Sequence, residues 1–299
     1  MAEVSTGAEL ASAERTGAVL SLRLLLALTK PRIAALSVAT AAVGIVLAPG
    51  RTPMRLGVAA LAGTWLIVGS ANTLNMYLER DIDAKMARTR RRPLPSGRML
   101  PWVALWFGVG EGVFGLLILA LFANALTGVL GAIALFVYVF VYTPMKQHSV
   151  HALLVGAVAG AMPPLLGWTA ATNELSAGGV GLFSVLFCWQ IPHFLAISMF
   201  RREDYRAAGL KVLPNVHGET ATRWAIAVGL VFQGIATLAL VPLGLGRGAY
   251  LAGALVLGAI MLGWAIVGIA RSGGNAWARR LFLMSVGFLP LLFAFLIVG

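Results

Sequence analysis

The chain has 299 residues, of which 59% are hydrophobic and only 11% are charged, and its mean hydropathy is +0.87. This composition is too apolar for an ordinary soluble globular protein. The net charge of +12 would suit a nucleic-acid-binding protein, but the basic residues lie between apolar runs instead of evenly along the chain. We therefore expect a lipid bilayer, and no nucleic acid, as the partner. The single cysteine, Cys188, excludes an intrachain disulfide.

The N-terminal segment differs from the rest of the chain. Residues 1–20 are mostly polar or small, which predicts a disordered cytoplasmic tail. It contains no short apolar segment with a cleavage site, so no cleaved signal peptide is expected. Ser21–Thr29 is typical of an interfacial helix. Residues 21–299 are expected to form a single transmembrane domain.

Nine apolar segments follow, each close to the roughly 20 residues that a membrane helix needs. They predict an all-α, polytopic membrane protein with helices at 32–49, 55–79, 100–122, 125–143, 151–172, 178–200, 223–243, 248–270 and 280–298. With the N-terminus inside, only Arg51, Arg55 and Arg247 among the lysines and arginines fall outside. Because basic residues concentrate on the cytoplasmic side, we expect a protein of the cell (inner) membrane with a cytoplasmic N-terminus and an outer C-terminus.

The inner end of the second segment carries four polar side chains: Asn72, Asn75, Glu79 and Asp83. Positions four apart stay near one helix face, because each step passes a full turn by about 40°. Stacked oxygen ligands beside cations suit Mg²⁺ and a phosphorylated substrate. The competing interpretation is a solvated helix end, where the acids pair with Arg80 and Lys85. The asparagines inside the apolar run favour a functional site.

A basic loop follows these acids, and Lys146 comes directly after the fourth segment. Part of this charge sets topology and attracts anionic lipid. Arg forks suit phosphate oxygens, and Lys supplies a point charge. We therefore expect Arg88, Arg92 and Lys146 to bind a diphosphate, and we assign Arg90 and Arg91 to topology.

Two features lie within the third and fifth segments. Glu111 is an isolated acid, and we expect it to be neutral and hydrogen-bonded to a neighbouring helix. Pro163-Pro164, close to Gly167, predicts a bend that shapes a cavity.

His193 and Asp204 form a second polar constellation. They are eleven residues apart, which on one continuous helix places them within about 20° of the same face. Pro192 can bend the helix beside His193. An isolated membrane histidine usually bonds a neighbouring helix, but the alignment with Asp204 favours a functional role.

The two longest inner loops, 80–99 and 201–222, share a pattern. Each follows the second helix of a four-helix block, begins with acids and bases, and then reaches a Leu-Pro pair and a glycine. The pattern favours two related halves with a ninth helix appended.

The Asn-x-x-x-acid-x-x-x-Asp element, the second acidic element and Tyr142-x-x-x-Lys146 resemble the UbiA superfamily of intramembrane prenyltransferases. Four longer strings resemble its haem-modifying branch: DIDAKMARTRRRPLPSG (81–97), GAMPPLLGW (160–168), IPHF (191–194) and EDYRAAGLKVLP (203–214). The resemblance extends over 27–299. Two positions depart from the superfamily pattern, since Glu79 and His193 stand where many members have Asp. The second departure fits the haem branch better than the quinone branch.

The resemblance implies a UbiA-type helix bundle that binds Mg²⁺ and farnesyl diphosphate and farnesylates a vinyl group of haem b to give haem O. Haem A synthase or terminal-oxidase assembly partners are also implied. The implied catalytic residues are Asn72, Asn75, Glu79, Asp83, Lys146, His193 and Asp204. The implied metal ligands are Asn75, Glu79, Asp83 and Asp204.

Two other functions compete with this one. A sister enzyme of the superfamily would prenylate an aromatic acid or quinone precursor. An Asp in place of His193 would favour it. A polytopic transporter would carry ionisable groups near the bilayer midplane. Apart from Glu111, the charged groups lie at the inner surface, which argues against transport.

Overall fold

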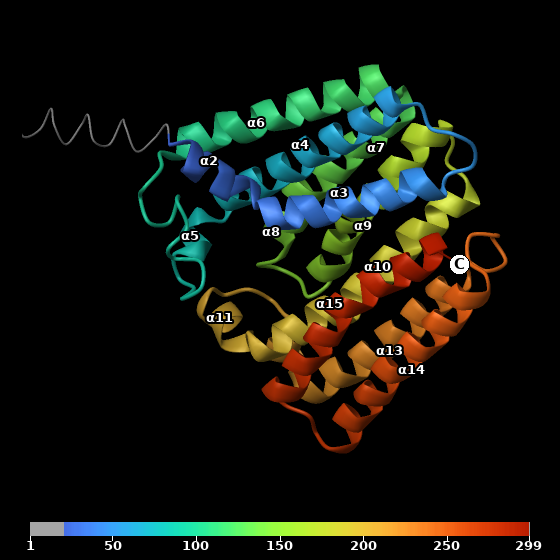
Figure 1. The fold of residues 1–299 in the computed structure, drawn as a ribbon. Coiled ribbons are helices and arrows are strands. Elements are labelled where there is room, and N and C mark those ends of the chain that lie inside the picture. Colours follow the sequence, from blue (N-terminus) through green and yellow to red (C-terminus); the bar gives the residue numbers. More distant parts are fainter. Residues whose placement is uncertain (1–20, 299) are drawn as a thin grey trace, which may run out of the picture.

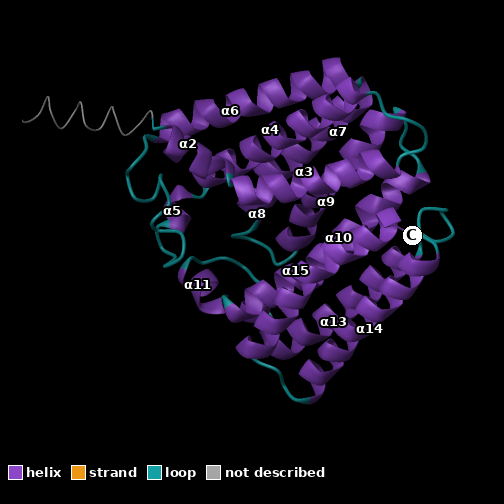
Figure 2. Ribbon diagram, in the orientation of Figure 1, coloured by secondary structure: helices purple, strands orange, loops and turns teal. Residues whose placement is uncertain are grey.

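The computed structural model describes residues 21–298, and these residues are helical, with no β-strand among them (Figures 1 and 2). The first half contains α2 (Leu22–Thr29), α3 (Pro31–Leu47), α4 (Met54–Leu78), α5 (Arg80–Asp83), α6 (Pro101–Leu117), η1 (Ile118–Ala123), α7 (Ala125–Phe136), η2 (Val137–Tyr142) and α8 (Thr143–Met145). The second contains α9 (Ala152–Thr172), α10 (Ala177–Phe200), α11 (Arg202–Ala207), α12 (Leu213–Val216), α13 (Gly218–Leu238), α14 (Gly248–Ala270) and α15 (Asn275–Val298). The predicted disordered tail over 1–20 lies outside the described residues.

The predicted helical membrane architecture is confirmed. Within 21–298, eight helices are long and apolar enough to cross a membrane, and the bent pair α2–α3 brings the count to nine. The two helices of that pair meet at 50°. Lys30 stands at the bend with a left-handed φ of 50°. A helix is therefore present where the sequence predicts one, as α2, and its interfacial position stays a prediction.

Two predicted spans are displaced. The seventh was expected at 223–243, but α13 begins at Gly218 and ends at Leu238. Hydropathy placed Arg223 at the boundary, whereas the structure buries it beside Glu219, one turn earlier. The ninth span was expected at 280–298, but α15 begins at Asn275. A local hydropathy pattern does not reveal such partners.

α9 is the central packing helix, because it lies against α3 on one side and α10 on the other (Figure 1). Glycines make the contact with α3 close. A Cβ on Gly44 would collide with the carbonyl oxygen of Pro164, and one on Gly167 would collide with that of Ala41. Small residues bring membrane helices together in this way and strengthen their van der Waals contact.

The segments that follow α4 and α10 meet. Figure 1 shows α5 and α11 at the same end of the molecule, away from the end of α15. Ile82 and Met86 pack with Ala208 and Leu210 in a small apolar cluster. The segments that carry the two acidic elements are thus brought together by apolar contacts between the halves.

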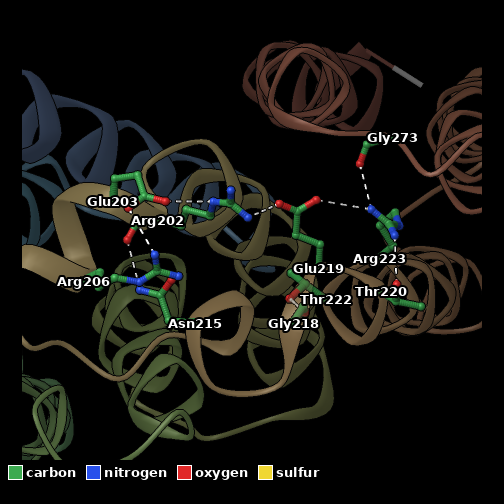
Figure 3. A network of polar contacts seen from close by, with 10 residues as sticks. All are labelled: Arg202, Glu203, Arg206, Asn215, Gly218, Glu219, Thr220, Thr222, Arg223 and Gly273. Carbon is green, nitrogen blue, oxygen red and sulfur yellow. Dashed lines mark hydrogen bonds and ion pairs between the residues drawn. The ribbon is translucent and has the colours of Figure 1, made fainter.

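A polar network secures the inner loop of the second half (Figure 3). Glu219 at the start of α13 pairs with Arg202 of α11 and with the buried Arg223. Arg223 also donates to the carbonyl of Gly273, in the turn before α15. The network therefore holds α11, α13 and the α14–α15 turn together.

Candidate functional site

The predicted polar face is buried at the C-terminal end of α4. The whole-residue exposures of Asn75, Glu79 and Asp83 are 3%, 7% and 1%. Although α4 ends at Leu78, the Glu79 N–H donates to the Asn75 carbonyl at 2.9 Å and the Asp83 N–H to the Glu79 carbonyl at 2.7 Å. Helical hydrogen bonding thus continues through the break between α4 and α5 and keeps the three residues in register.

Glu79 is held by an amide and an ammonium. Asn75 Nδ2 donates to Glu79 Oε2 at 2.9 Å. Lys146 Nζ lies 2.9 Å from Oε1 and 3.1 Å from Oε2. The Lys146 ammonium also lies 4.3 Å from the centre of the Tyr142 ring, a cation–π contact. The two elements predicted from the sequence, on α4 and beyond α8, therefore meet at one carboxylate.

The local shape of the fourth span explains how Lys146 and Thr143 reach α4. Pro144 has no N–H, and its ring disfavours a regular α-helix in the preceding turn. The chain widens there into the π-helical segment η2, in which the Thr143 hydroxyl donates to the Tyr138 carbonyl at 2.8 Å. Asn75 Nδ2 in turn donates to Thr143 Oγ1 at 3.1 Å. Thr143 was missed from the sequence, although a buried amide on α4 required a polar partner on another helix.

Asp83 is paired with Arg92, with Nη1 2.6 Å from Oδ2. The hydroxyl of Thr89 donates to the Asp83 backbone carbonyl at 2.7 Å and fixes the loop between them. The competing solvated-helix interpretation is wrong, because Glu79 and Asp83 pair with Lys146 and Arg92 instead of Arg80 and Lys85. These partners come from outside the helical segment, and both carboxylates are buried.

Lys30 is a site residue that the sequence analysis did not identify. It lies at the α2–α3 bend, ahead of the first span. It lines one pocket together with Arg88 and Arg92, and the charges of Arg92, Lys146, Glu79 and Asp83 all act on its ammonium group. Three cations and two carboxylates are therefore gathered at the C-terminal end of α4. The feature of the sequence that could have identified Lys30 is its place directly before Pro31, at the start of the first long apolar run.

Asn72 lies between this polar cluster and an apolar cavity. Its Nδ2 donates to the carbonyl of Thr29, at the end of α2, at 3.2 Å. It also lines a cavity of about 100 Å³ whose other walls are α3, the α7–η2 segment and α9. Tyr138 and Pro163 are among the lining residues, so one proline of the pair borders a cavity. α9 runs unbroken from Ala152 to Thr172, and the predicted bend stays a prediction.

His193 lies at the interface of α10 and α15. Its Nδ1 is 2.7 Å from the hydroxyl oxygen of Ser285, and its ring stacks on Trp189 with centroids 4.6 Å apart. Ser285 Oγ donates its only proton to the Phe282 carbonyl at 2.6 Å. His193 Nδ1 must therefore carry the proton that Ser285 accepts, which leaves an acceptor lone pair on Nε2.

The predicted shared face of His193 and Asp204 crosses a break between two helices. α10 ends at Phe200 and α11 begins at Arg202, with Arg201 at φ −113° and ψ 13° between them. The N–H of Arg201 donates to the Ile197 carbonyl at 3.0 Å, and the N–H of Tyr205 donates to the Arg201 carbonyl at 3.2 Å. Helical hydrogen bonding passes this break as it passes the one at Glu79, and the shared face stays a prediction. Asp204 is partly exposed and pairs with Arg201 at 3.7 Å.

The residues fit a divalent cation in part. Residues 21–298 contain no cluster of three or more His, Cys, Asp or Glu side chains that could hold a metal. Glu79 Oε1, however, is buried and, among the described residues, meets the Lys146 ammonium at 2.9 Å with no further hydrogen-bond donor. Carboxylate oxygens beside an amide are the donor set that Mg²⁺ prefers.

Glu111 has the expected helix partner. It is buried on α6, and the Thr73 hydroxyl of α4 donates to its Oε2 at 3.2 Å. Beside it, the hydroxyl of Ser70 donates to the carbonyl of Gly108 at 2.7 Å. These bonds hold α6 against the helix that carries the polar cluster.

Comparison with known proteins identifies relatives along nearly the whole chain. The model of the UbiA prenyltransferase family matches residues 37–287. The protoheme IX farnesyltransferase of Anaeromyxobacter dehalogenans (strain 2CP-C) is 51% identical over 275 residues, which cover 92% of this chain and 93% of that protein. The protoheme IX farnesyltransferase of Myxococcus xanthus (strain DK1622) is 48% identical over 270 residues, covering 90% and 92%.

Solved structures share the fold. A digeranylgeranylglyceryl phosphate synthase matches with a TM-score of 0.79 and 15% identity over 93% of this chain and 98% of that one. A UbiA homologue from Archaeoglobus fulgidus, bound to GPP and Mg²⁺, matches with a TM-score of 0.65 and 17% identity over 92% and 100%. At these identities the likeness concerns the helix arrangement alone.

Proposed function

The chain belongs to the UbiA prenyltransferase family, and we propose that it transfers the farnesyl group of farnesyl diphosphate to a vinyl group of haem b. The C–O bond to diphosphate breaks, and the allylic carbon bonds the terminal vinyl carbon. Water adds to the resulting cation and loses a proton. The products are haem O and diphosphate. The observation that carries the proposal is the near-50% identity to protoheme IX farnesyltransferases along most of the chain.

The polar cluster supplies the groups that this reaction needs. We assign Asn75, Glu79 and Asp83 to a Mg²⁺ ion, with Asp204 as a ligand from the other half. Mg²⁺ there would neutralise negative charge on the departing diphosphate. Glu79 Oε1 meets the Lys146 ammonium but no other donor among the described residues, so it keeps a lone pair for a cation, which supports this assignment.

The cations around these carboxylates would bind the diphosphate. We assign Arg88, Arg92 and Lys146 to the diphosphate oxygens and add Lys30 from the structure. Lys146 and Arg92 already point at Glu79 and Asp83, so a diphosphate held by them would lie beside the proposed metal ligands. Preorganised positive charge at the leaving group is an effective source of rate enhancement.

Asn72 and His193 are assigned to the apolar parts of the reaction. Asn72 borders the cavity between α3, α4 and α9, which would receive the start of the farnesyl chain while the rest extends between helices. His193 keeps a free Nε2 lone pair, which suits ligation of haem iron or acceptance of a proton at the reacting vinyl group. We place it on the haem side of the reaction.

Partners and location follow from the same assignment. The protein is multi-pass in the membrane by its many apolar helices. We propose the cell (inner) membrane, with the basic loops in the cytoplasm. Haem A synthase or a terminal-oxidase assembly factor would receive the product, and co-purification from native membranes tests such an association.

The test uses purified protein with haem b, farnesyl diphosphate and Mg²⁺, and the pigments are identified by mass spectrometry. We expect a product heavier than haem b by one farnesyl group and one hydroxyl. Parallel reactions contain aromatic acids or quinone precursors as acceptors. A prenylated aromatic product without haem O would replace our proposal with the sister activity.

A further inference from the structure

A basic pocket opens between α2 and the loop 84–98, at the rim of the carboxylate cluster. Its volume is about 540 Å³, within the roughly 300–1,000 Å³ usual for small-molecule sites. Its cationic lining residues are Arg23, Lys30, Arg88, Arg91, Arg92 and Arg98. Its apolar lining residues are Leu24, Ala27, Met76 and Pro93. The lining contains no carboxylate.

This positive charge is largely uncompensated. Among the described residues, Arg92 is the one lining cation that pairs with a carboxylate, and that carboxylate is Asp83. Arg98 is held by the carbonyl of Arg91 and by Ser96 Oγ, which are neutral acceptors. Like charges gathered in one pocket repel each other, and an anion with more than one charge relieves that repulsion.

The walls indicate what kind of anion fits. Lys30, Arg88 and Arg92 lie on the side of the pocket that we assign to the diphosphate, whereas Arg23, Arg91 and Arg98 have no such assignment. Glu79 and Lys146 do not line this pocket, so a diphosphate beside the proposed metal ligands leaves these three arginines without an anion. Leu24, Ala27 and the buried Met76 give the pocket an apolar side. The matching ligand therefore carries separate anionic groups on an apolar body.

We propose that this pocket binds the two propionate carboxylates of the tetrapyrrole acceptor, an inference that rests on the proposed function. The pocket shares Arg92 with the Asp83 pair, and Lys30 belongs both to the lining and to the carboxylate cluster. Carboxylates anchored there hold one edge of the ring at the cytoplasmic rim. The ring then extends toward the place where the allylic cation forms.

The test compares binding of haem b with binding of its dimethyl ester, in which both carboxylates are blocked. The variant is Arg23→Gln with Arg91→Gln, because both side chains are exposed and neither pairs with Glu79 or Asp83. Optical titration is done in nanodiscs of zwitterionic lipid without donor. Since hydrogen bonds to charged groups are the strong ones, we expect haem b to bind about 10- to 100-fold more weakly. Binding of the dimethyl ester should be unchanged.

The matched control is Arg90→Gln, an exposed arginine of the same loop outside the pocket lining, which should bind haem b as the wild type does. Arg23→Lys with Arg91→Lys should restore most of the affinity. Unchanged haem b binding in the double Gln variant overturns the inference. An equal loss of affinity for haem b and for its dimethyl ester overturns it as well. A selective loss of farnesyl diphosphate affinity would assign the pocket to the donor. A selective loss of retained phosphatidylglycerol would assign it to lipid.

The same preparations separate this inference from the proposed function. Wild-type protein that forms no haem O contradicts the proposed function. Wild-type protein that forms haem O, with a double Gln variant that binds haem b normally, contradicts the carboxylate pocket alone.

Discussion

The Asp83 carboxylate tests the metal assignment at the scale of one residue. It is buried and paired with Arg92, whereas Asp81, two positions away, has an 85% exposed side chain paired with Arg80. Asp83→Asn should lower turnover on the order of 10²–10³-fold, because it removes a carboxylate ligand of the proposed Mg²⁺ that would neutralise the departing diphosphate. Turnover is measured as haem O formed under saturating substrates.

Asp81→Asn is the matched control for Asp83 and should keep normal turnover. The thermal midpoints of both variants show whether folding is preserved. Normal turnover by Asp83→Asn, or by the wild type in excess chelator, would remove the metal hypothesis.

Substitution of His193 tests whether this residue acts on the haem acceptor. His193→Ala should lose haem O formation while farnesyl diphosphate binding persists, and a changed haem spectrum would indicate iron ligation. Ser285→Ala removes the acceptor that fixes the imidazole tautomer. Removing a hydrogen-bond partner that orients a functional imidazole lowers activity roughly 10–100-fold. Ser285→Ala should therefore form haem O more slowly but still measurably.

Cys188→Ala, on the same helix, serves as the control for both changes. Haem O synthesis at wild-type rates by His193→Ala would make this residue structural. Lost activity with an unaltered spectrum would leave a positioning or proton-transfer role.

At the scale of the elements, the approach of α3 to α9 depends on glycine. Gly167→Ala places a Cβ against the Ala41 carbonyl oxygen. Overpacking of this kind costs about 1–3 kcal/mol, so the thermal midpoint should fall by several degrees. Gly258→Ala in α14 meets nothing within 4 Å and should be neutral or slightly stabilising. Equal midpoints for the two variants would contradict the glycine contact.

The inner loop of the second half depends on Glu219. Glu219→Gln leaves the 8% exposed Arg223 side chain without its charged partner, at a cost of about 1–3 kcal/mol. We expect a lower thermal midpoint and faster proteolysis within 201–217. Glu203→Gln, whose side chain is 67% exposed, weakens two surface pairs, with Arg202 and Arg206, each worth about 0–1 kcal/mol. Proteolysis of Glu219→Gln at the wild-type rate would show that the network does not hold the loop.

At the scale of the whole molecule, the charge asymmetry predicts orientation. In a Cys188→Ala background, single cysteines at Lys85 or Arg206 should react with an impermeant thiol reagent only from the cytoplasmic side. Cysteines at Arg51 or Arg247 should react only from outside. The reverse pattern would invert the topology, and with it the side from which diphosphate enters.

Much of this molecule was predictable because the relevant signals are local. Hydropathy over windows of about 20 residues gave the order and number of spans. The four-residue spacing of Asn75, Glu79 and Asp83 gave a shared face that persists across the α4–α5 break. The eleven-residue spacing of His193 and Asp204 crosses a second break, at Arg201, which hydropathy and spacing do not reveal because it is a local change of backbone angles.

The sequence by itself determined the helix order, the polar face of α4 and the family resemblance, because periodicity and motif order belong to the chain. Only the tertiary structure decided that Glu79 meets Lys146 and that Lys30 joins them. It also decided that Ser285 orients His193. These contacts join residues far apart in the chain, so they depend on how the helices pack.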